Sequence, residues 1–238
     1  MRRFWDERAR ENPLYYVDNK LLFQAPDHDQ FWHQGERELD AMLDAVGARV
    51  GPDDVVVDIG CGVGRLTRVL ARRAGSVLAI DVSPEMLDRA RGYNPGLENV
   101  TWLKGDGASL APIADASADA CVSYVVFQHI PDPAIQLAYI REMGRVLRPG
   151  GWAAFQISND PHLHRFRPEL ERLRWRLRVL ARRAPRRQND PRWLGAALEL
   201  GALREAAASA GLDIERIENP GRQFCFVLAR RAAGDGTT

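Results

Sequence analysis

The segment Val55–Arg68 holds the residue types whose chemical use is clearest. A run of β-branched residues ends at Asp58, Gly60, Gly62 and Gly64 follow at alternate positions, and a helical pattern comes next. Glycines at a strand–helix junction let the backbone turn sharply and approach a ligand without Cβ atoms in the way. The segment therefore predicts a ligand-binding turn at the end of a buried strand.

Two carboxylates follow at the ends of the next two predicted strands. Asp81 lies 17 residues after Gly64, near the spacing of about 20 at which an acidic side chain binds ribose hydroxyls. Asp106, between Gly105 and Gly107, is placed to accept a hydrogen bond from an exocyclic adenine amine. The alternative for Asp81 is stabilisation of the next helix dipole, and the alternative for Asp106 is a simple turn residue.

The glycine spacing argues against two common nucleotide-binding classes. The pattern is GxGxG followed by Arg65, so it fails the GxGxxG dinucleotide fingerprint. An NAD-dependent dehydrogenase is therefore the weakest enzyme hypothesis. The segment also lacks the Gly-Lys-Ser/Thr of a P-loop.

In order along the chain, five segments resemble the motifs of class I S-adenosylmethionine-dependent methyltransferases, most of all the small-molecule (type 11, UbiE-like) branch. They are VVVDIGCGVG from Val55, Asp81, Gly105-Asp106, Ser117–Ile130 and Leu147–Phe155. Five ordered motifs are far more specific than any one of them. The resemblance implies a Rossmann-like fold and S-adenosylmethionine as the cofactor.

The resemblance also implies which residues contact the cofactor. The glycine loop would pack on its methionine and ribose parts, Asp81 would hold the ribose diol, and Asp106 would take the adenine amine. The implied cofactor-binding residues are Asp58, Gly60, Cys61, Gly62, Gly64, Asp81, Val82, Met86, Asp106, Gly107, Tyr124 and Gln128. Asp58 has an alternative role as a brace of the loop, and Cys61 is expected to fill space there and not to act as a nucleophile.

His129 follows the fourth predicted strand, where the resemblance places the methyl acceptor. An imidazole there is a candidate general base, and the alternative is a histidine of the pocket wall. Candidates for the acceptor pocket, with core packing or solvent exposure as the alternative, are Tyr15, Tyr16, Trp32, His33 and His162. No metal site is expected, because no ligand-spaced histidine pair accompanies a carboxylate.

Strands that alternate with helices must position these residues. Helices are expected over 2–12, 29–46, 65–74, 133–147 and 199–210, and another is expected to begin at Pro84. An aromatic link is expected over 14–17. Strands are expected over 55–57, 77–80, 100–103, 119–122, 152–157, 212–217 and 224–228. This alternation favours βαβ units and a parallel sheet with both faces buried. The last two strands lie close together in sequence, so at least one is expected to run antiparallel.

We therefore expect an α/β fold, a Rossmann-like doubly wound sheet of about seven mostly parallel strands, in one domain over residues 1–231. Residues 1–50 would form a helical N-terminal lid, and residues 158–198 a helical cap inserted after strand five. Together they would build the acceptor cavity. Residues 232–238 are predicted to be a disordered tail.

Composition sets the broad class. The 238 residues are 45% hydrophobic and 27% charged with a net charge of +1, as in an ordinary globular protein. No membrane span is expected, the charged N-terminal residues do not resemble a signal peptide, and three distant cysteines suit a reducing compartment. The expected location is cytoplasmic.

Arginines concentrate in the predicted helix 165–187. The helix is interpreted as an amphipathic cap with solvated arginines, or as a docking face for an acidic partner such as a carrier protein. DNA is not expected as a partner, and the oligomeric state stays open.

The main functional hypothesis is methyl transfer from S-adenosylmethionine to an O, N or C nucleophile of a small-molecule acceptor, in biosynthetic or specialised metabolism. One alternative is an RNA or protein methyltransferase that uses the basic helix 165–187. A second is a non-catalytic module that binds the cofactor, because binding and turnover share the same loop.

Overall fold

The computed structural model describes residues 1–164 and 191–233. Within them, seven strands form one sheet in the order β3-β2-β1-β4-β5-β7-β6. The strands are β1 (Val55–Ile59), β2 (Ser76–Asp81), β3 (Val100–Lys104), β4 (Ala118–Ser123), β5 (Leu147–Ile157), β6 (Leu212–Glu218) and β7 (Cys225–Arg231). β7 runs antiparallel to both of its neighbours, and the strands from β3 to β5 pair in parallel. The predicted fold class is confirmed, as is the antiparallel strand near the end of the chain.

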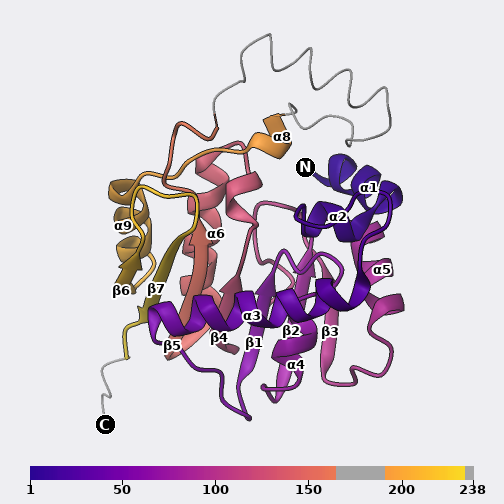
Figure 1. Ribbon diagram of the computed structural model, residues 1–238. Helices are drawn as coiled ribbons and strands as arrows, with labels where there is room; N and C mark the ends of the chain where they lie inside the picture. The colour runs from indigo at the N-terminus through magenta and orange to yellow at the C-terminus, as the bar shows by residue number, and fades with distance from the viewer. Residues whose placement is uncertain (165–190, 234–238) are drawn as a thin grey trace.

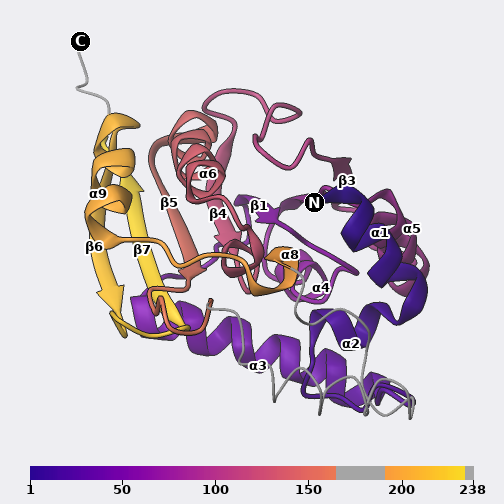
Figure 2. The same ribbon diagram turned by 90° about the horizontal axis from the view of Figure 1, so that it is seen from above.

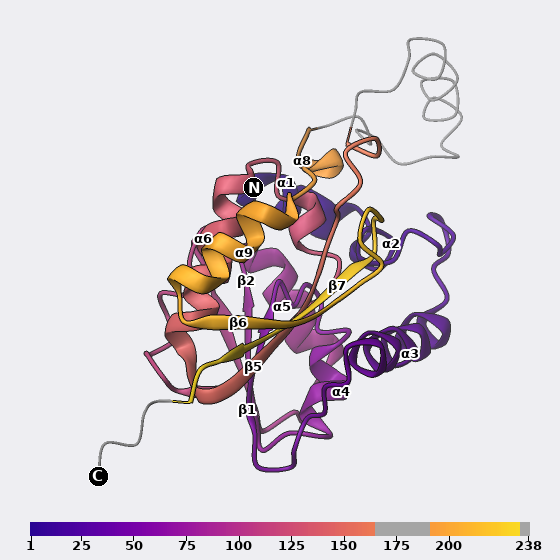
Figure 3. The same ribbon diagram turned by 90° about the vertical axis from the view of Figure 1, so that its left-hand side faces the viewer.

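Helices cover both faces of the sheet. They are α1 (Arg2–Glu11), α2 (Pro13–Val17), α3 (His28–Val46), α4 (Thr67–Ala71), α5 (Pro84–Tyr93), α6 (Pro133–Val146), α8 (Pro191–Leu194) and α9 (Leu200–Ser209), with a 3-10 turn η1 at Phe127–His129. Apolar residues of α3, α4 and α5 pack on one face, and those of α6 and α9 pack on the other. Figure 2 shows α3 and α6 on opposite sides of the strands, and Figure 3 shows the layers edge-on. Alternate strand residues enter the two cores, as a parallel sheet buried on both faces requires.

The first two helices lie apart from these layers, at the end of the sheet where β1 and β2 finish (Figure 1). The Ser83 hydroxyl donates to Asp6 of α1 at 2.6 Å, and Arg10 pairs with Glu85 at 2.6 Å. These contacts fasten α1 to the start of α5. Of the residues 1–50 predicted as a lid, only α1 and α2 roof the sheet end, because α3 packs on the sheet face.

Several element boundaries differ from the sequence prediction by a few residues, and three of the differences have a clear structural reason. The aromatic link is helix α2, because the Asn12 side chain caps it and Pro13 occupies its first turn. The helix expected over 65–74 is only α4, because the glycine loop continues as turns up to residue 66. β5 begins at Leu147, five residues before the predicted start, and a bulge in its pairing with β4 accommodates the extra residues.

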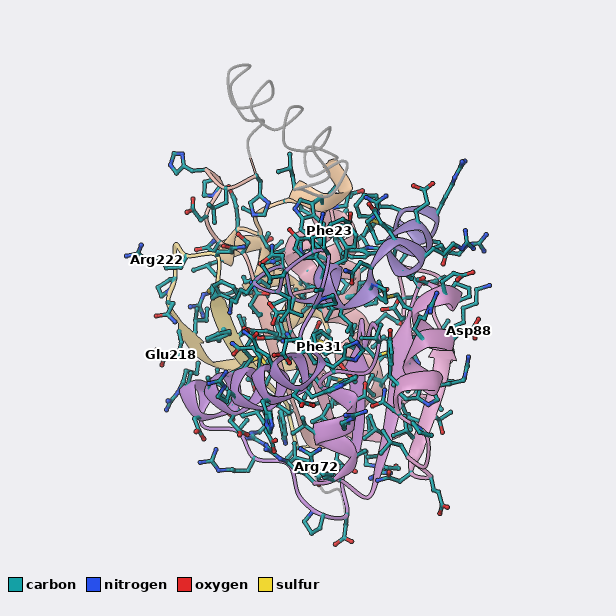
Figure 4. The ribbon with its side chains drawn as sticks, turned by 45° about the vertical axis from the view of Figure 1, so that its right-hand side comes forward. Phe23, Phe31, Arg72, Asp88, Glu218 and Arg222 are labelled. Carbon is teal, nitrogen blue, oxygen red and sulfur yellow. The ribbon has the colours of Figure 1, made fainter. Side chains whose placement is uncertain are left out.

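The arginine-rich helix predicted over 165–187 lies outside the described residues, as do residues 234–238 of the predicted tail. In the part of the chain that the structure describes, no helix has the length and apolarity to cross a membrane. Charged side chains such as Asp88, Glu218 and Arg222 lie at the periphery of the molecule, while Phe31 lies within its outline (Figure 4).

Candidate active site

A cavity lies at the carboxyl ends of β1, β2 and β4, beside the point where the strand order reverses between β1 and β4. Open α/β sheets bind ligands at this position. The space between its walls, open solvent at the mouth included, measures about 1030 Å³. Its lining residues are Met1, Trp5, Tyr16, Val17, Asp58, Ile59, Gly60, Cys61, Gly62, Arg65, Leu66, Ile80, Asp81, Val82, Met86, Gly107, Tyr124, Val125, Val126, His129, Ile130 and Tyr139.

The glycine loop forms the floor of this cavity. Gly60 has a φ of 73°, and a Cβ atom there would lie 2.4 Å from the Val126 side chain. The backbone N–H groups of Gly60 and Cys61 both donate to the carbonyl of Ile80, at 2.8 and 3.1 Å. Glycine is therefore required at position 60 for backbone conformation and for close packing.

Gly64 has a different role from the one implied by the resemblance. It does not line the cavity, and a Cβ atom there would lie 2.7 Å from the Asn94 amide nitrogen and 2.8 Å from the Trp102 ring. Its φ is 83°. The absence of a side chain at Gly64 thus lets the loop pack tightly against its own neighbours.

Asp81 faces the cavity from the end of β2. Its carboxylate accepts hydrogen bonds from the N–H of Gly62 at 2.9 Å and from the N–H of Ser83 at 2.8 Å. Burial raises the pKa of Asp81 to about 6. The carboxylate therefore joins the glycine loop to the start of α5, and its position on the lining also leaves it available to a ligand.

Asp58 is a second buried carboxyl group in the same wall. It accepts a hydrogen bond from the Thr67 hydroxyl at 2.5 Å, and burial raises its pKa to about 7. Its contact with Thr67 braces the loop against α4, while its place on the lining keeps it within the cavity. The structure thus shows Asp58 as a brace of the loop, and its contact with the cofactor stays a prediction.

The wall opposite the glycine loop is the turn that follows β4. Its central residue, Val125, has a φ of 57°, a left-handed conformation that β-branched residues rarely adopt. The Val125 N–H donates to the side-chain oxygen of Gln156 at 3.0 Å. Tyr124 and Val126, on either side, also line the cavity.

His129 lines the cavity with both ring nitrogens hydrogen-bonded. Nδ1 lies 2.7 Å from the Trp193 carbonyl oxygen, which can only accept, so Nδ1 carries the proton. Nε2 lies 3.3 Å from the Gln128 amide nitrogen and therefore accepts from it. Burial lowers the pKa of His129 to about 4, so the ring is neutral at pH 7.

Aromatic side chains form the roof. Trp5 of α1 contacts the His129 ring edge-on with the centroids 5.7 Å apart, and Tyr16 of α2 contacts Trp193 at 5.6 Å. The Tyr16 hydroxyl donates to Glu11 at 2.8 Å. The roof therefore joins α1, α2 and α8, segments that lie far apart in sequence.

The structure brings most of the predicted residues to this one cavity and leaves others outside it. Those on the lining are Asp58, Gly60, Cys61, Gly62, Asp81, Val82, Met86, Gly107, Tyr124, His129 and Tyr16, whereas Gly64, Asp106, Gln128, Tyr15, Trp32, His33 and His162 are not on it. Asp106 is exposed and accepts from Ala108 and Ser109 of its own loop. His33 and His162 are exposed.

Sequence reasoning missed Trp5, Arg65 and Gln156. Arg65 is buried and pairs with Glu38 at 2.7 Å and with Asp18 at 3.4 Å. The signal for Gln156 was an amide within the apolar strand β5, where an unpaired polar group would be costly. The signal for Arg65 was a charged residue inside a loop of small and apolar residues.

The donor set fits S-adenosylmethionine. Two carboxyl groups suit ribose hydroxyls and a nearby positive charge, and the glycines at 60 and 62 leave room for a ligand against the backbone. Among the described lining residues, the side chain of Arg65 is already paired with carboxylates and so is not available to a phosphate. Within residues 1–164 and 191–233, no His, Cys, Asp or Glu cluster of three or more could hold a metal ion.

Comparison with known proteins agrees with this geometry. Residues 57–155 match the family described as "Methyltransferase domain". The chain is 34% identical over 152 residues to a ubiquinone biosynthesis O-methyltransferase of Xanthomonas oryzae, covering 63% of this chain and 53% of the relative. It is 42% identical over 113 residues to an uncharacterised 37.1 kDa protein of a Streptomyces fradiae transposon, covering 46% of this chain and 31% of that protein. The chain thus spans about half the length of the first relative and about a third of the second.

Solved structures share the fold at lower sequence identity. An S-adenosylmethionine-dependent methyltransferase from Mesorhizobium loti aligns with a TM-score of 0.60 at 24% identity, covering 82% of this chain and 96% of that one. A chain from the complex of the Haloferax volcanii Trm112 methyltransferase activator with a methyltransferase aligns with a TM-score of 0.61 at 19% identity, covering 95% and 98%. Residues 57–155 thus match a methyltransferase domain, and the fold, the ordered motifs and these matches support a class I S-adenosylmethionine-dependent methyltransferase of the UbiE-like type.

Proposed function

We propose that this protein transfers a methyl group from S-adenosylmethionine to an O, N or C nucleophile of a small-molecule acceptor, in biosynthetic or specialised metabolism. The observation that carries the proposal is that Trp5 and Tyr16 of the roof line the same cavity as the glycine loop. The space beside the cofactor is therefore roofed on one side by the chain itself. A small molecule fits such a space, whereas a polymer needs an open groove.

The residues of the floor would bind and orient the cofactor. We infer that Asp81 accepts the ribose hydroxyls, that the glycines at 60 and 62 pack under the ligand, and that Met86 and Val82 lie against the adenine. When bound, S-adenosylmethionine supplies a methyl group on a positively charged sulfur. The acidic lining suits that charge, and the aromatic roof would exclude water from it.

His129 would orient the acceptor side and not remove a proton. Its Nε2 already accepts from Gln128, and its pKa of about 4 makes it a weak base. Most of the acceleration would then come from alignment of the nucleophile with the methyl group, which can supply several kcal/mol. The general-base role stays a prediction, and unchanged turnover in a His129→Asn variant would argue against it.

The Xanthomonas oryzae relative is a ubiquinone biosynthesis O-methyltransferase, and this supports a small acceptor with a hydroxyl group. The alternative RNA or protein methyltransferase depends on residues 165–187, which lie outside the described structure. The alternative of a non-catalytic module predicts cofactor binding without turnover.

A panel of phenols, alcohols, amines and carbon acids tests the proposal. Each is incubated with the protein and S-adenosylmethionine, and methylated product and S-adenosylhomocysteine are both measured by mass spectrometry. We expect product from at least one small acceptor, and about 10–100-fold slower product formation by the Asp81→Asn variant at a cofactor concentration below the wild-type dissociation constant. Turnover only on RNA or on a protein substrate would replace the proposal with the first alternative. Binding of cofactor without turnover on any acceptor would favour the second.

A further inference from the structure

The turn after β4 holds a valine in a conformation that valine avoids. Val125 has a φ of 57°, and a β-branched side chain in this region is a genuine outlier that persists only where the surroundings impose it. The residue lies on the cavity lining, between Tyr124 and Val126. Strain of this kind at a ligand site is a reason to look for the group that maintains it.

Gln156 is that group. It is completely buried in β5, and its side-chain oxygen accepts the Val125 N–H at 3.0 Å. Its amide nitrogen lies within hydrogen-bond distance of the carbonyls of Ile157 and Gln223 and of the side-chain oxygen of Gln128. These contacts hold the amide nitrogen on the side away from the turn, so the side-chain oxygen of Gln156 points toward the turn.

The turn matters because it faces the glycine loop. A Cβ atom on Gly60 would lie 2.4 Å from one Val126 methyl group and 2.7 Å from the other, so the two walls are in tight contact. On the other side of the turn, the ring of Tyr124 stacks near Phe224 and Phe226. A change in the Val125 backbone would therefore shift both of its neighbours on the lining.

We propose that Gln156 is a positioning residue, which holds Val125 in its left-handed conformation and so keeps the wall opposite the glycine loop in the shape that binds the cofactor. This inference rests on the cofactor site described above. It gives Gln156 a role through Val125, without contact with the ligand.

A double-mutant cycle tests the coupling. Gln156→Leu removes the acceptor, and Val125→Gly removes the need for it, because glycine adopts a positive φ at little cost. We expect Gln156→Leu to weaken S-adenosylhomocysteine binding at least about tenfold, since only the fraction of molecules with the native turn binds. In the Val125→Gly background the same substitution should weaken binding less than about threefold. Isothermal titration calorimetry measures each dissociation constant.

Gln136→Leu is the matched control. Gln136 is also completely buried, and its amide nitrogen donates to the backbone carbonyls of Ile130, a residue of the lining, and of Ala196, but it does not contact Val125. We expect a comparable fall in melting temperature and less than about a threefold change in binding. Val125→Asn is a second relief variant, because asparagine tolerates the left-handed region better than valine.

Three results would overturn the inference: equal binding losses for Gln156→Leu and Gln136→Leu, no binding loss for Gln156→Leu, or the same loss with valine and glycine at position 125. If Gln156→Leu does not fold, binding is measured with Gln156→Met in its place. Folding of Gln156→Leu in the Val125→Gly background would then support the coupling, and failure of that double variant to fold would contradict it. Failure of the wild-type protein to bind S-adenosylhomocysteine would instead count against the cofactor site itself.

Discussion

The floor and the roof of the cavity are built in different ways. The floor consists of the glycine loop and Asp81, which belong to adjacent parallel strands and are joined by backbone hydrogen bonds of 2.8–3.1 Å. The roof consists of Trp5, Tyr16 and Trp193, whose helices come from opposite ends of the described chain and meet through ring contacts. The sheet therefore dictates the floor, whereas packing between distant segments forms the roof. The cavity is thus divided into the side that we propose for the cofactor and the side that we propose for the acceptor.

The largest expected effect concerns the residue that joins the two regions. Arg65, at the end of the glycine loop, is 3% exposed and pairs with Asp18 after α2 and with Glu38 on α3. Arg65→Met would leave the buried Asp18 without its cation and take from Glu38 one of its two, since Glu38 also pairs with Lys20 at 2.8 Å. We expect it to lower the free energy of unfolding by about 3–5 kcal/mol. Urea denaturation measures this.

Arg72→Met is the control, because its pair with Glu36 is roughly half exposed on both sides and should contribute under about 1 kcal/mol. Equal losses for the two arginine variants would show that the floor and the N-terminal segments are not coupled through Arg65.

The next effect tests the packing of the floor. Gly60 and Gly47 have nearly the same φ, 73° and 75°, but only at Gly60 would a Cβ atom clash. Alanine at either position costs about 1–2 kcal/mol for the backbone conformation alone. We expect Gly60→Ala to lower the free energy of unfolding by a further 1–3 kcal/mol, roughly, for overpacking. Equal stability of the two variants would contradict the close contact with Val126.

A smaller effect follows from the raised pKa values of the floor carboxyls. Burial raises the pKa of Asp81 to about 6 and that of Asp58 to about 7. Their contribution to folding stability is therefore full below pH 4, roughly, and is lost as pH rises through 6 to 7. Cofactor binding should change in the opposite direction, because ribose hydroxyls need an ionised acceptor.

We expect S-adenosylhomocysteine affinity to fall about tenfold for each pH unit below 6, and this slope to vanish in Asp81→Asn. Calorimetry between pH 5 and 8 provides the measurement. A flat profile for the wild-type protein would mean that Asp81 does not carry the ribose contact.

The smallest expected effect concerns the roof. Trp5→Ala removes ring contacts with His129 and Trp193 but no part of the glycine loop. We expect less than about a threefold change in S-adenosylhomocysteine affinity, with a larger change in the Michaelis constant of whichever acceptor is turned over. A tenfold loss of cofactor affinity would place Trp5 in the cofactor site and remove the distinction between the two regions.

The floor of the cavity could be predicted from the sequence better than the contacts between distant segments. The sheet, its antiparallel strand and the lining role of Gly60, Gly62 and Asp81 were predictable, because strand ends and the residues after them are neighbours in sequence. The role of Gln156 was not, because its contact with Val125 spans 31 residues and depends on register between β4 and β5. The tertiary fold sets this contact, and the sequence indicates it only through a polar residue within an apolar strand.

The roof shows why the acceptor candidates were harder to choose. Tyr15 and Tyr16 are adjacent, and only the second lines the cavity, because helix α2 turns consecutive side chains about 100° apart. The sequence predicts a link and not a helix over residues 14–17, and a link does not distinguish the direction of Tyr15 from that of Tyr16. Asp106 shows the reverse case, since a turn carboxylate between glycines can satisfy itself within its own loop.

Binding of S-adenosylhomocysteine to the wild-type protein and to Asp81→Asn, measured by calorimetry at pH 7.5, tests the central claim most directly. Asp88→Asn, an exposed carboxylate of α5, is the charge control (Figure 4). We expect binding to the wild-type protein and to the control, and a loss of about 10–100-fold, or about 1.5–3 kcal/mol, in Asp81→Asn. Equal affinity of the wild-type protein and Asp81→Asn, or no binding by the folded wild-type protein, would contradict the assignment of this cavity as the cofactor site.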